Sequence, residues 1–320
     1  MQCSKYTNLS DESKAGSNIE NIDEALDFSY NSPIYKEFLD FIKSRKNKSV
    51  LYAYSGGLDS TVVLFLLNNL CKENKIKLNT FTINNGFKGE KTWNNIKNVI
   101  KFLNIEENYE IYDIRKNIVT DEEILSRFGN GNTVEEIYSL AILNDILPCG
   151  KVCNTIMDNK YKEILKAKEE EYLITGGDTP KVRNNKYSVI WYKKNGLKIV
   201  RGAAGFRLNK NLVKQLLKEN NIPWENPNYG GYDTDCLIPG TILASKNNGN
   251  QTINIYEIIE KYPVVFEYLK ERLRLNIIDR KTSLCDLNNL DINTFSGYIE
   301  ANKTAVKVLK RRINNNVQIK

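Results

Sequence analysis

The 320-residue sequence contains no histidine, so any catalysis here proceeds without imidazole. It also lacks long hydrophobic runs, and stretches such as Val62 to Leu67 are far too short to span a bilayer. The N-terminal stretch MQCSKYTNLSDESKAGSNIENIDEALDF is polar and partly acidic, without the apolar segment of a secretory signal. We therefore expect a cytoplasmic protein with no membrane partner.

The composition is otherwise ordinary for a globular protein, with 41% hydrophobic and 27% charged residues. A chain of this length can bury a substantial core, and one large domain with a smaller one is the natural expectation. The formal net charge of +7 permits binding to nucleic acid or phosphorylated ligands without requiring it.

The six cysteines do not favour a disulfide framework, because the chain is large and is expected to be cytosolic. Cys71 ends an apolar helical stretch and is predicted to be a core residue, while Cys3 and Cys285 have no neighbouring cysteine in the sequence. The three remaining cysteines need another explanation, and they are Cys149, Cys153 and Cys236.

Strand and helix patterns alternate along the first two thirds of the chain, which predicts an α/β fold with a doubly wound parallel sheet. The predicted strands are 49–54, 78–85, 109–114 and 172–175. The predicted helices begin near Pro33 and then cover 61–73, 90–104, 132–147, 159–170 and 209–223. Residues 181–200 are expected to form an irregular loop or a hairpin.

The same patterns predict three regions. Residues 1–30 form an N-terminal extension with few core positions, and residues 31–240 form the α/β domain. Residues 241–320 show helical patterns and form a small C-terminal helical domain.

The segment SGGLDS, residues 55–60, lies between a predicted strand and a predicted helix. Backbone N–H groups at such a junction bind anions, and two glycines let a phosphate approach the backbone closely. Ser55, Ser60 and Thr61 add hydroxyl donors, and Asp59 would hold Mg²⁺ against the phosphate oxygens. The simpler alternative is a helix cap and a turn without a ligand. The Gly-Lys-Ser/Thr ending of a Walker A loop is missing.

SGGLDS resembles the SGGxDS signature of the N-type ATP pyrophosphatase (PP-loop) superfamily. The resemblance implies a Rossmann-like fold of the adenine nucleotide α hydrolase type and cleavage of ATP between its α and β phosphates. It also implies that the pyrophosphate portion contacts Ser55, Gly56, Gly57, Asp59 and Ser60. The end of the second strand, at Thr82-Ile83-Asn84, would face the adenine.

The order of the cysteines is similar to that in one branch, the iron–sulfur tRNA 2-thiocytidine and 2-thiouridine synthetases. Cys149 and Cys153 open a helix, Gly176-Gly177-Asp178 follows the next strand, and Cys236 follows a later helix. The sequence departs from the branch in having Cys-x-x-x-Cys, a single downstream cysteine, and Gly-Gly-Asp in place of a Gly-His motif. The resemblance implies that Cys149, Cys153 and Cys236 bind a [4Fe–4S] cluster, and that Gly176 and Asp178 line the nucleotide site.

The three cysteines are also compatible with roles that need no cluster. Zinc would need a fourth ligand, from a carboxylate or Cys285, because histidine is absent. A persulfide relay between two cysteines is a stronger competitor, and coincidental core cysteines are the simplest alternative.

The resulting hypothesis is an ATP-dependent sulfurtransferase that uses ATP, Mg²⁺ and the cluster to replace a carbonyl or amide oxygen by sulfur. Its partners would be a tRNA base or a small-molecule amide or nucleobase, together with a sulfide or persulfide donor; a homodimer is compatible with the sequence. The alternatives are a ligase that uses ammonia or an amine, with structural cysteines, and a non-catalytic nucleotide-binding protein.

Basic residues at two places could contact phosphates, although solvated surface charge accounts for each of them as well. The first set, near the expected nucleotide site, is Lys181, Arg183, Arg201 and Arg207. The second set, at helical spacing near the C-terminus, is Lys303, Lys307, Lys310, Arg311 and Arg312.

Overall fold

A computed structural model describes part of the chain. The described residues are 32–45, 49–130, 132–135, 137–138, 151–177, 180–183, 185–193 and 195–227. Several predictions lie outside them: the N-terminal extension, the C-terminal helical domain with its basic residues, and the placement of Cys149, Asp178 and Cys236.

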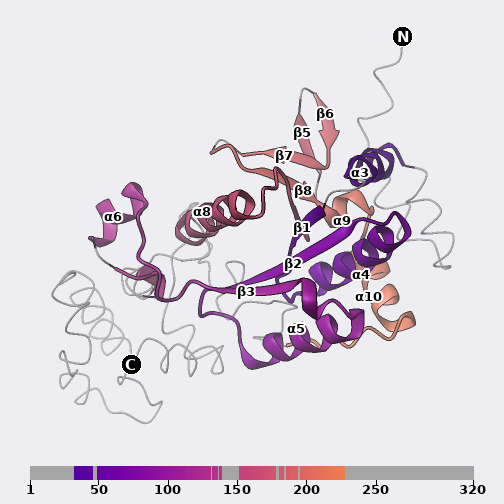
Figure 1. Ribbon diagram of the computed structural model, residues 1–320, viewed down its shortest axis with the longest axis horizontal. Helices are drawn as coiled ribbons and strands as arrows, with labels where there is room; N and C mark the ends of the chain where they lie inside the picture. The colour runs from indigo at the N-terminus through magenta and orange to yellow at the C-terminus, as the bar shows by residue number, and fades with distance from the viewer. Residues whose placement is uncertain are drawn as a thin grey trace, which may run out of the picture. The chain divides into compact units, whose positions relative to one another are not determined.

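The centre of the fold is a six-stranded sheet with the order β3-β2-β1-β4-β8-β7 (Figure 1). Strand β1 pairs in parallel with β2 and β4, β4 pairs in parallel with β8, and β7 is antiparallel to β8. The mostly parallel sheet confirms the predicted α/β class. The strands are β1 (Ser49–Ala53), β2 (Lys77–Asn84), β3 (Tyr109–Asp113), β4 (Leu173–Thr175), β7 (Ile190–Tyr192) and β8 (Lys198–Arg201).

The helices of the described residues alternate with these strands. They are α3 (Pro33–Lys43), α4 (Leu58–Glu73), α5 (Glu90–Leu103), α6 (Glu122–Phe128), α8 (Lys151–Ala167), α9 (Gly202–Gly205) and α10 (Lys210–Glu219), with a 3₁₀ turn η2 (Glu106–Asn108). Helix α3 begins where Ser32 accepts a hydrogen bond from the Tyr35 N–H and Pro33 occupies the first turn.

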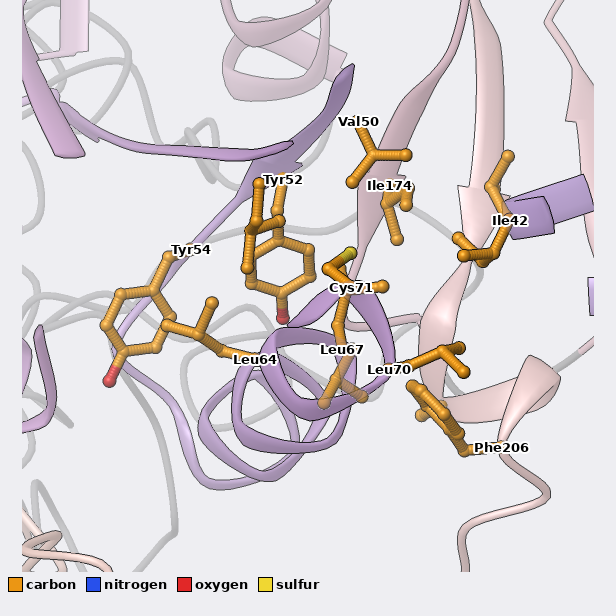
Figure 2. Close-up of a cluster of buried hydrophobic side chains, with 14 of the residues drawn as sticks. Ile42, Val50, Tyr52, Tyr54, Leu64, Leu67, Leu70, Cys71, Ile174 and Phe206 are labelled. Atoms are coloured by element: carbon orange, nitrogen blue, oxygen red, sulfur yellow. The ribbon is translucent and has the colours of Figure 1, made fainter. Parts of the chain in front are cut away.

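The main core lies between one face of the sheet and helix α4. Tyr52 of β1 is in register with Ile174 of β4, which is in register with Val200 of β8, so all three side chains point to the same face. Figure 2 shows Tyr52 and Ile174 beside Leu67 of α4. On the opposite face, the ring of Phe81 packs edge-on against Tyr161 of α8 at 6.1 Å.

The segment 181–201 differs in part from the prediction of an irregular loop or hairpin. A hairpin is present, formed by β5 (Lys181–Arg183) and β6 (Lys186–Ser188), and β7 and β8 form a second antiparallel pair. However, β8 is also a strand of the main sheet, parallel to β4, which the sequence patterns did not predict. Helix α8 begins at Lys151, earlier than residue 159, and Cys153 lies in its first turn, in agreement with the prediction that Cys153 lies at the start of a helix.

Contacts along the chain define two compact units. The first takes its described residues from the segment ending at Ile83 and from Glu90–Tyr112 and Tyr161–Pro227. The second takes them from Asn84–Gly89 and Asp113–Lys160. No helix among the described residues combines the length and the apolar character needed to cross a membrane.

Candidate nucleotide-phosphate site

The loop 54–57, which contains Ser55, Gly56 and Gly57, joins β1 to the first turn of α4. Gly56 has φ +87°, a conformation that residues with a side chain rarely adopt. A Cβ atom built there would lie 2.7 Å from Ile96 Cγ1 and 2.9 Å from Thr92 Cγ2, both of α5. Both the backbone conformation and the packing therefore require glycine at position 56.

Two buried tyrosines, one within β1 and one just after it, hold the start of α4. The Tyr52 hydroxyl donates to the Ser60 carbonyl at 2.7 Å and lies 3.1 Å from the Ser60 hydroxyl. The Tyr54 hydroxyl lies 2.9 Å from the Thr61 hydroxyl, which in turn donates to the Gly57 carbonyl at 2.9 Å. Burial raises the pKa of Tyr52, so this hydroxyl keeps its proton and can donate it to the carbonyl.

The three hydroxyl residues that we expected to contact phosphate differ in exposure. Ser55 is partly exposed, and its hydroxyl accepts a hydrogen bond from the Gly57 N–H at 3.3 Å. Ser60 is 6% exposed and its hydroxyl accepts from the Ser55 N–H at 3.1 Å. Thr61 is fully buried, with its hydroxyl engaged by Tyr54 and Gly57. In this geometry Thr61 stabilises the loop from inside the protein.

Asp59 lies in the first turn of α4 and is partly exposed. The positive end of the helix dipole favours a carboxylate there, and it equally favours a bound anion. A carboxylate beside a phosphate requires a cation between them, and carboxylate oxygens are ligands that Mg²⁺ accepts. Asp59 is therefore placed where it could hold a metal that also contacts a phosphate at the helix end.

Thr82, expected near the adenine, is buried in β2 with 1% of its surface exposed. Its hydroxyl donates to the Tyr54 carbonyl at 2.8 Å, immediately before the glycine turn. This hydrogen bond links β2 to the last residue ahead of Ser55.

The Gly-Gly pair after β4 lies against the same helix end. A Cβ at Gly176 would be 2.9 Å from Ser60 Cα, so the backbone just after β4 lies too close to the start of α4 for a side chain to fit between them. A Cβ at Gly177 would be 2.8 Å from the guanidinium carbon of Arg201, at the end of β8. The carboxyl ends of β1, β4 and β8 thus bring the phosphate loop, the Gly-Gly pair and one cation together, where ligands bind in open α/β sheets.

One contact of the loop was not predicted from the sequence. The indole N–H of Trp224, from the segment after α10, donates to the Gly56 carbonyl at 3.0 Å. The next residue, Glu225, forms two backbone hydrogen bonds with the Asn95 side chain of α5, at 2.7 and 3.0 Å. These three hydrogen bonds fix the segment against the loop, and no local sequence signal could reveal contacts over more than a hundred residues.

Of the cysteines, the structure describes Cys71 and Cys153. Cys71 is buried in α4 with 1% of its surface exposed, and burial raises the pKa of its thiol to about 12, in agreement with a core role. Cys153 is partly exposed in the first turn of α8. Within the described ranges, no group of three or more Cys, Asp or Glu side chains could hold a metal ion. That statement does not bear on the predicted trio, because Cys149 and Cys236 lie outside those ranges.

A glycine turn between a parallel strand and a helix is typical of α/β proteins with a phosphate-binding loop, and this turn lacks the ending of a Walker A loop. Comparison with protein families gives the particular class: residues 30–126 match the PP-loop domain. The chain therefore contains a PP-loop domain, as the SGGLDS signature predicted.

Two curated proteins are similar to parts of the chain. One is an uncharacterized protein of Methanocaldococcus jannaschii, 27% identical over 195 residues, which are 60% of this chain and 59% of that protein. The other is the tRNA(Ile)-lysidine synthase of Buchnera aphidicola, 33% identical over 133 residues, which are 35% of this chain and 30% of that protein. The chain thus spans about three fifths or less of the length of these relatives.

Solved structures with 14% sequence identity also resemble the chain. The U34-tRNA thiolase NcsA of Methanococcus maripaludis, with its [4Fe–4S] cluster, has a TM-score of 0.39 over 88% of this chain and 80% of its own. The FMN adenylyltransferase of Candida glabrata has a TM-score of 0.45 over 80% and 79%. The NH3-dependent NAD synthetase of Campylobacter jejuni has a TM-score of 0.35 over 89% and 93%.

Proposed function

We propose that this protein is an ATP-dependent sulfurtransferase that adenylylates a carbonyl or amide oxygen and then replaces that oxygen by sulfur. The observation that carries the proposal is the Gly56 turn, which leaves no space for a side chain and lies at the N-terminus of α4. The match of residues 30–126 to the PP-loop domain supports ATP as the ligand of this turn.

In the first step, the substrate oxygen attacks the α phosphorus of ATP. A new P–O bond forms, the bond between the α phosphorus and its bridging oxygen breaks, and pyrophosphate leaves with the electron pair. The backbone N–H groups at the start of α4 hold the pyrophosphate portion, and Arg201 adds positive charge at the same sheet edge. Asp59 would hold Mg²⁺, which when bound supplies charge neutralisation for the leaving group.

In the second step, a sulfide from the donor attacks the activated carbon. A C–S bond forms, the C–O bond breaks, and AMP leaves with the oxygen that came from the substrate. Cys149, Cys153 and Cys236 would hold the [4Fe–4S] cluster, which when bound supplies an iron site for sulfide. Partial exposure of Cys153 fits a ligand role better than the deep burial of Cys71 does.

The test is anaerobic purification followed by iron and acid-labile sulfide analysis. We expect both elements in the wild-type protein, and their loss in Cys149→Ala, Cys153→Ala and Cys236→Ala. Cys3→Ala is the matched control and should keep the cluster. A colourless, iron-free protein that still forms a thiolated product would contradict the cluster and favour the persulfide relay.

The second candidate is a PP-loop ligase that joins ammonia or an amine to the adenylylated carbon. The similarity to a protein named tRNA(Ile)-lysidine synthase supports this ligase as the second candidate. The two candidates share the first step and differ in their need for the cysteines. Full product formation by the three cysteine variants, with ammonia or an amine present, would favour the ligase.

A further inference from the structure

Residues 222–227, which we call the strap, follow α10 and pack against the start of α4. Ile222 is 4% exposed, and its N–H donates to the Leu217 carbonyl at 3.0 Å. The Trp224 ring packs against an apolar cluster that consists of Leu58, Val62, Leu212, Val213 and Leu216. Two of these residues belong to α4 and three to α10, so the ring joins both helices.

One turn of α5 holds both the strap and the glycine turn. Asn95 is 3% exposed, and its amide donates to the Glu225 carbonyl and accepts from the Glu225 N–H. A buried amide is costly without partners, and the strap satisfies this one on both its atoms. Thr92 and Ile96 of the same turn are the residues that a Cβ at Gly56 would meet. The position of Trp224 relative to Gly56 is therefore fixed.

The hydrogen bond of Trp224 determines the direction of one peptide group. The indole N–H donates to the Gly56 carbonyl at 3.0 Å, and the peptide bond that follows Gly56 is trans. In a trans peptide the C=O and the next N–H point in opposite directions, so the Gly57 N–H points away from the indole. It points toward the hydroxyl of Ser55, at 3.3 Å.

Without this bond the peptide group would have two orientations available. Gly56 has φ +87° and Gly57 has φ −77°. A flip of the peptide plane would change φ of Gly57 by about 180°, to a positive value that glycine adopts readily. The flipped peptide would present its N–H to the indole and its carbonyl oxygen to the Ser55 side. An indole N–H is only a donor, so Trp224 favours the observed orientation.

The observed orientation is the one that suits an anion. A phosphate oxygen accepts hydrogen bonds, and it would be repelled by a carbonyl oxygen in the flipped peptide. The bond from the Gly57 N–H to Ser55 is longer than usual, so the N–H can exchange it for a stronger bond to a charged oxygen.

We infer that Trp224 is a positioning residue for the ATP site: it holds the Gly56–Gly57 peptide so that the Gly57 N–H faces the pyrophosphate portion of ATP. This inference rests on the proposed function for the identity of the anion. The indole touches neither the substrate nor the reacting atoms, and it acts through the peptide group.

The experiment observes this peptide group by NMR, with inorganic pyrophosphate and Mg²⁺ as the probe. Glycine labelled with ¹³C at the carbonyl and ¹⁵N at the amide gives a carbonyl-to-amide correlation only where two glycines are adjacent. The sequence has three such pairs, 56–57, 176–177 and 230–231, and Gly57→Ala identifies the first by its loss. In the wild-type protein, pyrophosphate should move the Gly57 amide proton downfield, because the N–H gains a charged acceptor.

Trp224→Phe keeps a ring on the apolar cluster and removes the N–H. The Gly56 carbonyl carbon should move upfield because it loses its donor, and the affinity for pyrophosphate should fall by about fivefold. The matched control is Asn74→Ala, which removes a side-chain hydrogen bond to the Leu70 carbonyl at the far end of α4. It should leave both the correlation and the affinity unchanged.

A purely structural role of Trp224 gives a different result. Trp224→Phe would then lower the free energy of unfolding but keep the wild-type carbonyl shift and pyrophosphate affinity, and this outcome would overturn the inference. The titration of the wild-type protein is a second test that needs no substitution at Trp224: pyrophosphate binding without a shift of the Gly57 amide proton would also overturn it.

The inference and the proposed function can fail separately. Formation of AMP from ATP is measured on its own, and the NMR titration requires no turnover. AMP formation with wild-type pyrophosphate binding in Trp224→Phe would retain the proposed function and reject the positioning role. Weaker pyrophosphate binding in Trp224→Phe, with no AMP from the wild-type protein, would retain the positioning role and reject the proposed function.

Discussion

The glycine loop 54–57 and the segment 181–201 differ in the space around their glycines and in the charge that they carry. The loop has no room for one more carbon atom at Gly56, because a Cβ there would meet the side chains of Ile96 and Thr92. The segment 181–201 offers side-chain charge, and its turn residue Gly196 has no neighbouring atom within 4 Å of an added Cβ. The loop should therefore be sensitive to volume and the segment to charge.

The sharpest test of this contrast is Gly56→Ala. Left-handed strain and overpacking together should lower the free energy of unfolding by about 2–4 kcal/mol, and ATP binding should be lost. Chemical denaturation and calorimetric titration with ATP measure the two effects.

Gly196→Ala is the matched control, because Gly196 has φ +85° but open space around it. Strain alone should cost about 1–2 kcal/mol, and ATP affinity should not change. Equal losses of ATP affinity in both variants would show that packing at Gly56 has no special role.

The next effect concerns Asp59. Asp59→Asn keeps the size of the side chain but removes the charge proposed to hold Mg²⁺. The rate of AMP formation should fall by about a hundredfold, which corresponds to about 2.7 kcal/mol of barrier. The free energy of unfolding should change by less than about 1 kcal/mol. A wild-type rate of AMP formation in Asp59→Asn would show that Asp59 does not hold the metal.

The buried hydroxyl of Thr61 and the partly exposed hydroxyl of Ser55 should have different effects when removed, and both effects should be smaller than that of Asp59→Asn. Thr61→Val removes the hydroxyl that contacts the Tyr54 hydroxyl and donates to the Gly57 carbonyl, and should lower the free energy of unfolding by about 1–2 kcal/mol. Ser55→Ala removes a partly exposed hydroxyl and should mainly weaken ATP binding, as measured by calorimetric titration. Weaker ATP binding in Thr61→Val, together with lower stability in Ser55→Ala, would show that Thr61 contacts the phosphate instead.

The smallest expected effect is that of Trp224→Phe, which removes the hydrogen bond to the Gly56 carbonyl. The net value of such a bond is about 1 kcal/mol, so ATP affinity should fall by about fivefold in the same titration. Asn74→Ala, which removes a hydrogen bond to the Leu70 carbonyl at the far end of α4, is the control and should leave ATP affinity unchanged. An equal loss of ATP affinity in Asn74→Ala would show that the hydrogen bond to Gly56 has no special role.

Much of the loop could be predicted from the sequence, because its elements are contiguous. A buried strand, SGGLDS and a helix follow one another without interruption, and the PP-loop resemblance rests on those same residues. The Gly-Gly pair after β4 could be placed at the same sheet edge, since parallel strands bring their carboxyl ends together.

The parts that could not be predicted depend on distant residues. Strand β8 is only four residues long and lies in a run of lysines, so its local pattern resembles a loop. The hydrogen bond of Trp224 to Gly56 joins positions 168 residues apart. Thr61 has the residue type of a phosphate ligand, and only its burial against Tyr54 reveals its supporting role.

The central claim is that the SGGLDS loop directs cleavage of ATP between its α and β phosphates. The most direct test incubates the protein with ATP, Mg²⁺, sulfide and a small-RNA fraction, and separates the nucleotide products by anion-exchange chromatography. We predict AMP and pyrophosphate from the wild-type protein and neither from Asp59→Ala. Formation of ADP and orthophosphate, or an equal yield of AMP from Asp59→Ala, would contradict the claim.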